Sequence, residues 1–361
     1  MGNKQIIGCL ASIIISIATI ATAEAQGLLP SDSDSNYVCG AQGAEIARQN
    51  MARMVLIQSI GPAVQPEPGA EGEEPQQRGR QVGTGSGLVL PGGQYILTNH
   101  HVVSMEDTDY ADVTYVGVFN SGIPVELKYV SSDAAMDLAI LEVNPADVPS
   151  SFPHHLGLEY RDSSDLNILE QVYALGNPLG LFFTAVELEI ASEFPYMLGG
   201  ITTLPDGSQA QVPSRGFLMS DGLNPGNSGG PIFDCQGRFA GVAVAIHGVG
   251  AGGPALSIGI PAELAEKAVP YLIKGQPLPR AGFGGMMLNQ QAQVMMVLPE
   301  SPAQGAGLMA GDLVHAINGR ITLHNSGYVA MYLSEVFVGE TVEVEVLRRG
   351  FAAPIKLQIQ M

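Results

Sequence analysis

Short apolar segments separated by turn-forming residues are the feature that most limits what this chain can fold into. Each segment has the length of a β-strand, and Gly, Pro, Asn or Asp stands between one segment and the next. The clearest examples are residues 87–90, 95–98, 125–130, 138–143, 172–175 and 239–246. Many short strands with frequent turns are typical of a β-sandwich or a β-barrel. We therefore predict a mainly β fold for the larger part of the chain.

The chain is too long for one hydrophobic core of ordinary size, because it has 361 residues. The larger of at least two units should occupy residues 26–270. It should begin with a short helix near Gly43 that passes into a strand at residues 54–60. Residues 62–81 are rich in Pro, Gly, Glu and Gln and predict a flexible loop. In residues 186–190, apolar side chains alternate with Glu, which indicates a strand with one buried face.

A smaller unit should follow near residue 270. Three prolines there indicate a linker between the units, Pro270, Pro277 and Pro279. Apolar residues then recur at helical spacing within 328–337, and residues 342–346 and 355–359 alternate strictly between apolar and polar. Residues 271–361 therefore predict a linker followed by a small α+β domain.

The N-terminus has the pattern of a secretory signal peptide. Lys4 precedes an uncharged segment at residues 5–23, and small residues at its end would allow cleavage after Ala23 or Ala25. Residues 1–25 are thus expected to be removed on export, which leaves no stable membrane insertion. The competing interpretation is an uncleaved anchor, because the segment is near the length that spans a bilayer.

Net charge limits the classes of partner. With a formal net charge of -19 and only 16 Lys and Arg, the chain lacks the basic surface that nucleic acids and anionic membranes require. Peptides or proteins are better candidate partners.

Two cysteines remain after the expected cleavage, Cys39 and Cys235. An oxidising compartment would allow a long-range disulfide between them. Because no feature of the sequence brings them together, two separate buried thiols are the favoured interpretation. A CxxC pattern or a Cys/His metal cluster is absent, His154 and His155 are assigned to a loop, and no metal or other cofactor is expected.

Three local patterns contain residues that could form a catalytic triad. Residues 98–103 carry His100 and His101 after a strand, residues 133–139 carry Asp133 and Asp137, and residues 224–231 form a glycine-rich turn around Ser228. A serine hydroxyl becomes a nucleophile when a base lies beside it and a third group fixes the tautomer of the base. Glycines beside the nucleophile let backbone NH groups turn toward an oxyanion, and the expected donors are Gly226 and Ser228.

These patterns resemble those of the HtrA family of serine proteases. The resemblance rests on T-N-x-H-V at 98–102, D-L-A at 137–139, A-L-G-N-P-L-G at 174–180 and N-P-G-N-S-G-G-P at 224–231. It implies a chymotrypsin-like double β-barrel protease domain followed by a PDZ domain. Carried over by residue, His101 is the general base, Asp137 orients it and Ser228 is the nucleophile, whereas His100 and Asp133 are set aside.

The resemblance extends to the last domain, which matches the PDZ pattern at 301–303, 306–308, 310–312 and 317–319. A PDZ domain binds a peptide end as an added strand and holds its carboxylate on loop NH groups. The corresponding loop contains Phe283, Gly284, Gly285 and Met286, although relatives usually have a bulky residue where Gly284 stands. The resemblance further implies a periplasmic location, unfolded polypeptides and peptide C-termini as partners, and a homotrimer.

The specificity pocket is expected at Gly222, Ile246 and His247. Gly222 stands six positions before the serine, where trypsin-like cleavage after Lys or Arg needs a carboxylate. An apolar pocket and cleavage after small aliphatic residues are therefore expected, and His247 leaves cleavage after acidic residues as an alternative. An inactive chaperone or peptide-binding module on the same scaffold is the alternative function, and a processing protease with one substrate is a third.

Overall fold

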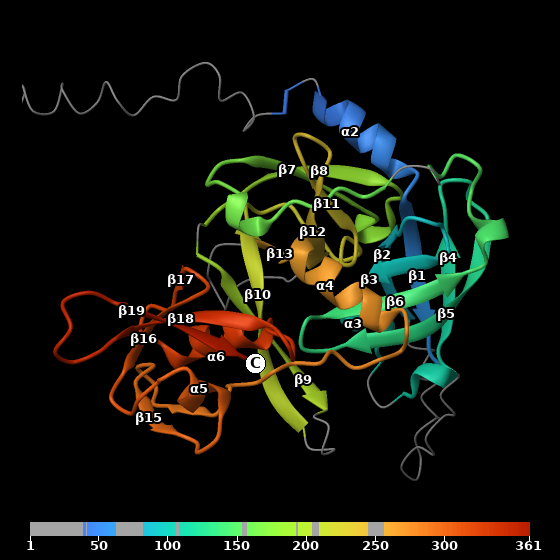
Figure 1. The fold of residues 1–361 in the computed structure, drawn as a ribbon. Coiled ribbons are helices and arrows are strands. Elements are labelled where there is room, and N and C mark those ends of the chain that lie inside the picture. Colours follow the sequence, from blue (N-terminus) through green and yellow to red (C-terminus); the bar gives the residue numbers. More distant parts are fainter. Residues whose placement is uncertain are drawn as a thin grey trace, which may run out of the picture.

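The computed structural model describes residues 39–40, 42–62, 82–105, 108–153, 157–192, 194–203, 209–244 and 256–361. The predicted signal peptide and nearly all of the loop predicted at residues 62–81 lie outside these residues, so both remain predictions. Figure 1 shows a β-barrel in blue to green, a second β-structure in green and yellow, and a smaller domain in orange and red. Within the described chain, no helix is both long and apolar enough to cross a bilayer.

The first barrel is closed and has the strand order β1-β2-β3-β6-β5-β4. Its elements follow helix α2 (Gln42–Met51) and are β1 (Met54–Ile60), β2 (Val82–Val89), β3 (Tyr95–Thr98), α3 (His100–Val103), β4 (Thr114–Val118), β5 (Pro124–Asp133) and β6 (Leu138–Val143). Val102 and Val103 of α3 are buried in the core of this barrel, with 3% and 0% of their surface exposed. The one-turn helix that carries the two adjacent histidines is thereby fixed to the barrel.

A seven-stranded sheet with the order β8-β7-β11-β12-β13-β10-β9 forms the second half of the larger unit. Its strands are β7 (Gln171–Gly176), β8 (Thr184–Glu189), β9 (Tyr196–Thr203), β10 (Gln209–Met219), β11 (Pro231–Asp234), β12 (Phe239–Val244) and β13 (Ser257–Pro261). A bridge between Ile190 and Met219, with a 2.8 Å hydrogen bond from Ala191 N to Leu218 O, joins the end of β8 to β10. Six strands therefore close into a second barrel, which confirms the predicted double-barrel fold, and β9 extends from it as a hairpin with β10.

The prediction that Pro270 belongs to a linker is wrong. Pro270 lies in the last turn of helix α4 (Ala262–Leu272), which follows β13 directly. The helix buries apolar residues at helical spacing, namely Ala262, Leu264, Ala265, Ala268, Val269 and Leu272. A proline removes only one backbone hydrogen bond there, and the burial of this apolar face offsets that loss.

The prediction that the two cysteines stay separate is also wrong, because Cys39 and Cys235 form a disulfide with their Cα atoms 4.8 Å apart. Cys39 lies just before α2, and a side chain on Gly43 of this helix would overlap Tyr173 of β7. Cys235 follows β11, which pairs with β7. The packing of α2 on β7 therefore brings together two residues that are 196 positions apart.

The C-terminal domain has the predicted α+β composition. It contains β14 (Met286–Leu288), β15 (Val294–Val297), α5 (Pro302–Gly305), β16 (Leu313–Ile317), β17 (Arg320–Ile321), α6 (Ser326–Ser334), β18 (Thr341–Leu347) and β19 (Ile355–Gln360). Strands β14 and β15 form a hairpin, and the other four form a sheet in the order β17-β16-β18-β19. Val342, Val344 and Val346 are fully buried, as the alternating pattern predicts.

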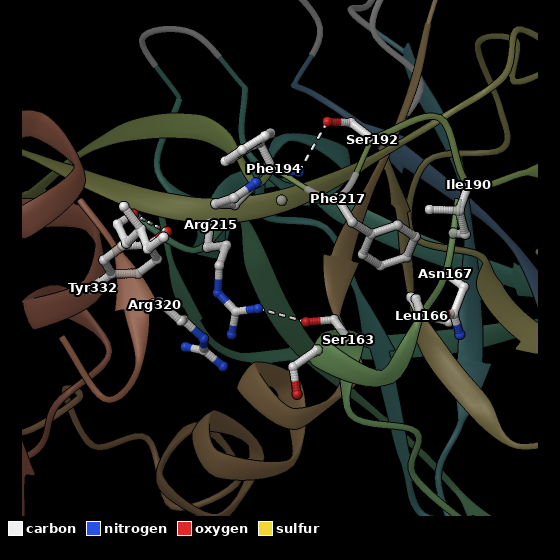
Figure 2. Close-up of a pocket in the computed structure, with 14 residues that line it drawn as sticks. Ser163, Leu166, Asn167, Ile190, Ser192, Phe194, Arg215, Phe217, Arg320 and Tyr332 are labelled. Atoms are coloured by element: carbon white, nitrogen blue, oxygen red, sulfur yellow. Dashed lines mark hydrogen bonds between the residues drawn. The ribbon is translucent and has the colours of Figure 1, made fainter. Parts of the chain in front are cut away.

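A buried ion cluster joins this domain to the second barrel. Arg215 of β10 is only 5% exposed, and it donates from Nε to Glu335 Oε1 at 2.8 Å and from Nη2 to Glu263 Oε1 at 2.7 Å. Figure 2 shows its third contact, a hydrogen bond to Ser163 beside a cavity of about 480 Å³ that Arg320 also lines. Burial lowers the pKa of Arg215, but the two carboxylates outweigh it and raise that pKa. The arginine stays charged and fixes the contact between the domains.

Replacing Ser334 by alanine is expected to weaken the same contact. Ser334 Oγ lies 2.7 Å from Pro213 O of β10, so the variant leaves a carbonyl without this donor and should lower the free energy of unfolding by about 0.5–1.5 kcal/mol. Guanidinium unfolding measures the change. The exposed Ser121→Ala is the matched control, and equal stability of both variants would contradict the expected role of the hydrogen bond.

Candidate active site

The glycine-rich turn around Ser228 connects β10 to β11. Gly226 has φ of +103° and Gly229 has φ of +84°, in the region that favours glycine. A Cβ on Gly226 would lie 2.3 Å from the Asn177 carbonyl oxygen, and one on Gly229 would lie 2.2 Å from the Ser86 carbonyl oxygen. The two glycines are therefore needed both for the turn itself and for its close approach to neighbouring backbone.

Ser86 of β2 holds this turn to the first barrel. Its hydroxyl donates to Gly226 O at 2.7 Å, and its NH donates to Ser228 O at 2.7 Å. From the second barrel, the NH and the side-chain amide of Asn177 both donate to Ser86 Oγ at 3.0 Å. Sequence reasoning missed Ser86, although glycines at every second position around it, from residue 83 to residue 87, indicated a close backbone contact.

The glycine-rich turn around Ser228 lies directly against the segment that leads into α3. A Cβ on Gly229 would meet Thr98 Oγ1 at 2.2 Å and the backbone nitrogen of Asn99 at 3.1 Å. Thr98 Oγ1 in turn donates to Ser86 O at 2.7 Å. The residues next to Ser228 are therefore packed on the residues that immediately precede the two histidines.

His101 and Asp137 are joined by two hydrogen bonds. The imidazole Nδ1 lies 2.7 Å from Asp137 Oδ2, and the backbone NH of His101 donates to Oδ1 at 2.9 Å. Asp137 has φ of +53°, and its carbonyl accepts from His100 N at 3.1 Å and from Asn99 Nδ2 at 2.9 Å. With the Nδ1 proton directed to the carboxylate, the Nε2 lone pair is free to act as a base. The imidazole is 45% exposed, which allows a substrate to reach it.

The alternative base and acid point elsewhere. His100 Nδ1 lies 3.0 Å from Ser132 Oγ. Asp133 forms a bidentate pair with Arg280 at 2.8 and 2.7 Å and accepts a further hydrogen bond from Met136 N. Asp133 therefore belongs to the contact with the C-terminal domain, and the structure pairs Asp137 with His101.

The Gly226 NH has a defined direction. The carbonyl of Pro225 accepts from Leu179 N at 2.9 Å, and Leu179 belongs to the short 3₁₀ turn Pro178–Gly180. No described peptide bond is cis, so the Gly226 NH points opposite to this carbonyl, away from Leu179. Ser86 fixes the other side of Gly226 through its carbonyl. Leu179 thus holds the Pro225–Gly226 peptide unit and Ser86 holds the next one, and the Gly226 NH is turned away from the Leu179 turn.

The predicted specificity pocket is only partly described. A Cβ on Gly222 would lie 2.7 Å from Leu188 Cδ2 and 3.1 Å from Val186 Cγ1, so the residue rests against the apolar face of β8. Ile246 and His247 lie outside the described residues. In the part of the chain that is described, no cluster of three or more His, Cys, Asp or Glu could hold a metal ion.

The predicted peptide loop of the C-terminal domain forms a turn before β14. Gly284 and Gly285 have φ of +57° and +88°, and the Gly284 carbonyl accepts from Ala303 N at 3.0 Å. The NH of Gly285 consequently points away from Ala303. The NH of Met286 donates within the turn to Phe283 O at 3.1 Å, so it is already used by the loop itself.

Two family models match successive parts of the chain. Residues 85–242 match the family model of a trypsin-like peptidase domain, and residues 258–359 match that of a PDZ domain. A probable periplasmic serine endoprotease DegP-like of Marinomonas sp. (strain MWYL1) is 29% identical over 303 residues, which are 80% of this chain and 59% of that protein. The chain therefore consists of a trypsin-like peptidase domain followed by a PDZ domain.

A second relative and two solved structures give similar values. The DegP-like protein of Halomonas elongata is 30% identical over 298 residues, 78% of this chain and 56% of its own length. The chain thus spans a little over half the length of these curated relatives. Among solved structures, the HtrA-type protease AlgW with tripeptide has a TM-score of 0.55 and 20% identity, over 88% of this chain and 95% of that one. The serine endoprotease from Yersinia pestis has a TM-score of 0.50 and 22% identity, over 92% and 98%. The chain shares its fold with these solved structures.

Proposed function

We propose that this chain is a serine endopeptidase of HtrA type that hydrolyses peptide bonds in unfolded or misfolded exported proteins. The observation that carries the proposal is the 2.7 Å contact between His101 Nδ1 and Asp137 Oδ2, beside a nucleophile turn packed on the same segment. An imidazole oriented in this way is the base that a serine hydroxyl needs.

In the proposed mechanism Ser228 Oγ attacks the peptide carbonyl while His101 Nε2 takes its proton. Asp137 holds the imidazole in the required tautomer and stabilises the imidazolium. The NH groups of Gly226 and Ser228 donate to the oxyanion of the tetrahedral intermediate. His101 then gives the proton to the leaving amine, and a water molecule hydrolyses the acyl-enzyme by the same steps. These groups need no cofactor.

The PDZ domain has a proposed role in binding peptide ends. β14 pairs only with β15 among the described strands, so an extended peptide could add to its other edge. The Gly285 NH is the proposed donor to the peptide carboxylate. A periplasmic location after removal of residues 1–25 is proposed by similarity to the relatives named periplasmic. A homotrimeric assembly is proposed from the resemblance of the sequence to the HtrA family.

Casein digestion tests the function. Wild-type protein should degrade casein, whereas Ser228→Ala should leave it intact while keeping the same thermal unfolding temperature. Failure of wild type to digest casein or a broad peptide library would favour the alternative, a chaperone or peptide-binding module on the same scaffold. Digestion of a single peptide but not of casein would favour a processing protease.

Cleavage-site profiling is expected to show small aliphatic residues before the cut bond. Gly222 rests against Leu188 and Val186 and carries no carboxylate, so an apolar side chain fits this pocket better than a basic one. His247→Leu should leave this preference unchanged. Preference of the wild type for acidic residues, lost in His247→Leu, would contradict the expectation and assign the pocket to acidic side chains.

A further inference from the structure

His100, the neighbour of the proposed base, is tied to strand β5 through a chain of polar contacts. Its Nδ1 lies 3.0 Å from Ser132 Oγ, which lies 2.8 Å from the Tyr129 hydroxyl. The Tyr110 hydroxyl approaches the same Nδ1 at 3.4 Å, and the Tyr110 ring stacks on Tyr129 with centroids 4.2 Å apart. The hydroxyl groups of two segments of the first barrel thus lie close to the imidazole of His100.

This chain of contacts links the two segments that carry the proposed base and its acid. Helix α3 is a single turn, and the side chain of its N-cap residue Asn99 makes no capping hydrogen bond. Ser132 stands near the end of β5, and the turn that follows β5 carries Asp137. An imidazole fixed at Ser132 therefore limits how α3 can rotate relative to that turn.

We propose that His100 is a positioning residue that, in its neutral form, orients helix α3 so that His101 Nδ1 stays aligned with Asp137 Oδ2. A neutral His100 can accept at Nδ1 from the Ser132 hydroxyl, which in turn can accept from Tyr129. A protonated His100 must donate at Nδ1, so the Ser132 hydroxyl can no longer donate to it and has to turn its proton elsewhere. Protonation also places a positive charge next to His101, which itself becomes cationic during catalysis.

The surroundings favour the neutral form. Burial lowers the pKa of His100, and it outweighs the opposing charges of Asp137 and Asp133, while His101 lowers the pKa further. Burial also raises the pKa of Tyr129, so this phenol stays neutral. Because the pKa in the folded state lies below the ordinary value of about 6.5, the unfolded chain binds this proton first. The stability that neutral His100 contributes is complete above about pH 6.5 and is lost as the pH falls through the lower value.

The positioning role of His100 rests on the proposed hydrolytic function. The pH dependence of kcat/KM tests this positioning role. In wild type, log kcat/KM should fall more steeply at acid pH than in a variant without the His100 imidazole, because protonation of His100 disturbs the alignment of helix α3. His100→Asn cannot be protonated at this position and should show the shallower fall. His100→Ala should lower kcat at pH 8 by about 10-fold to 100-fold with KM nearly unchanged, and the amide of His100→Asn should restore part of that loss.

Two controls separate positioning from a general loss of structure. Ser132→Ala and Tyr129→Phe each remove one hydroxyl group from the chain and should lower kcat in the same direction as His100→Ala. Thermal unfolding of every variant is followed in parallel. Equal acid slopes in wild type and His100→Asn, or losses of kcat that only follow losses of stability, would overturn the proposal.

A measurement without turnover separates this proposal from the proposed function. In Ser228→Ala protein with labelled histidines, NMR should show a hydrogen-bonded His101 Nδ1 proton whose signal weakens as His100 is protonated. The same signal should shift or broaden in the double variant with His100→Ala. An unchanged signal would overturn the positioning role. If the signal behaves as expected and wild type digests nothing, only the proposed function fails.

Discussion

Asp137→Asn is expected to lower kcat/KM for an unfolded substrate by about 10⁴-fold without disturbing the fold. Asparagine accepts a positive φ well, so the value of +53° at this position should be kept. If its carbonyl oxygen continues to accept from the His101 NH, its NH₂ group faces His101 Nδ1. The imidazole proton must then move to Nε2, where it blocks proton transfer from Ser228.

Asp133→Asn is the matched control for this prediction. Asp133 pairs with Arg280 on the other side of the domain contact, so its amide variant should keep kcat/KM within about threefold of wild type while losing about 1–3 kcal/mol of stability. Steady-state kinetics and guanidinium unfolding of both variants give the comparison. Equal losses of activity in the two variants would return Asp133 to consideration as the catalytic acid.

Loss of the Cys39–Cys235 disulfide is expected to lower the free energy of unfolding by about 5 kcal/mol. The bond joins residues 196 positions apart, and the entropy that a cross-link removes from the unfolded chain grows with the size of the closed loop. Both sulfur-bearing residues are 3% exposed, so reduction should be slow in the native state and fast in partly denaturing conditions.

Guanidinium unfolding with and without dithiothreitol measures this effect. The reductant should lower the midpoint of the wild type, whereas the double variant Cys39→Ser/Cys235→Ser should unfold at the lower midpoint with or without it. The third cysteine, Cys9, lies in the predicted signal peptide. A reductant-insensitive midpoint in the wild type would show that the cross-link does not contribute to stability.

Local sequence patterns predicted those strands in which every second residue, or every residue, is buried. The boundaries predicted for residues 95–98 and 138–143 agree with those of β3 and β6. β2 begins earlier than predicted, because its first residues include Gly83 and Gly85, which give no apolar pattern. Gly85 is needed there because a Cβ would lie 2.5 Å from Val102. The start of β2 is determined by the residues that pack against it, so it cannot be recognised from the residues of the strand alone.

Contacts between distant segments could not be predicted. A buried arginine such as Arg215 is stable only with its partners, and Glu335 lies 120 residues later in the chain. The disulfide also depends on a contact between distant segments, since its two cysteines meet only after α2 packs on β7. The choice between Asp133 and Asp137, by contrast, rested on a short motif, and the structure pairs the second of them with His101.

The hydrogen bonds of Ser86 have a consequence for the order in which the proposed site is assembled. Ser86 is synthesised 140 residues before Gly226, and it holds the glycine-rich turn only once the two barrels have met. A chain that has been synthesised only as far as the first barrel contains His101 and Asp137 but not the turn that carries Ser228. Under the proposed function, such a chain would therefore lack its nucleophile, and the site would be complete only when the second barrel has been made and has met the first.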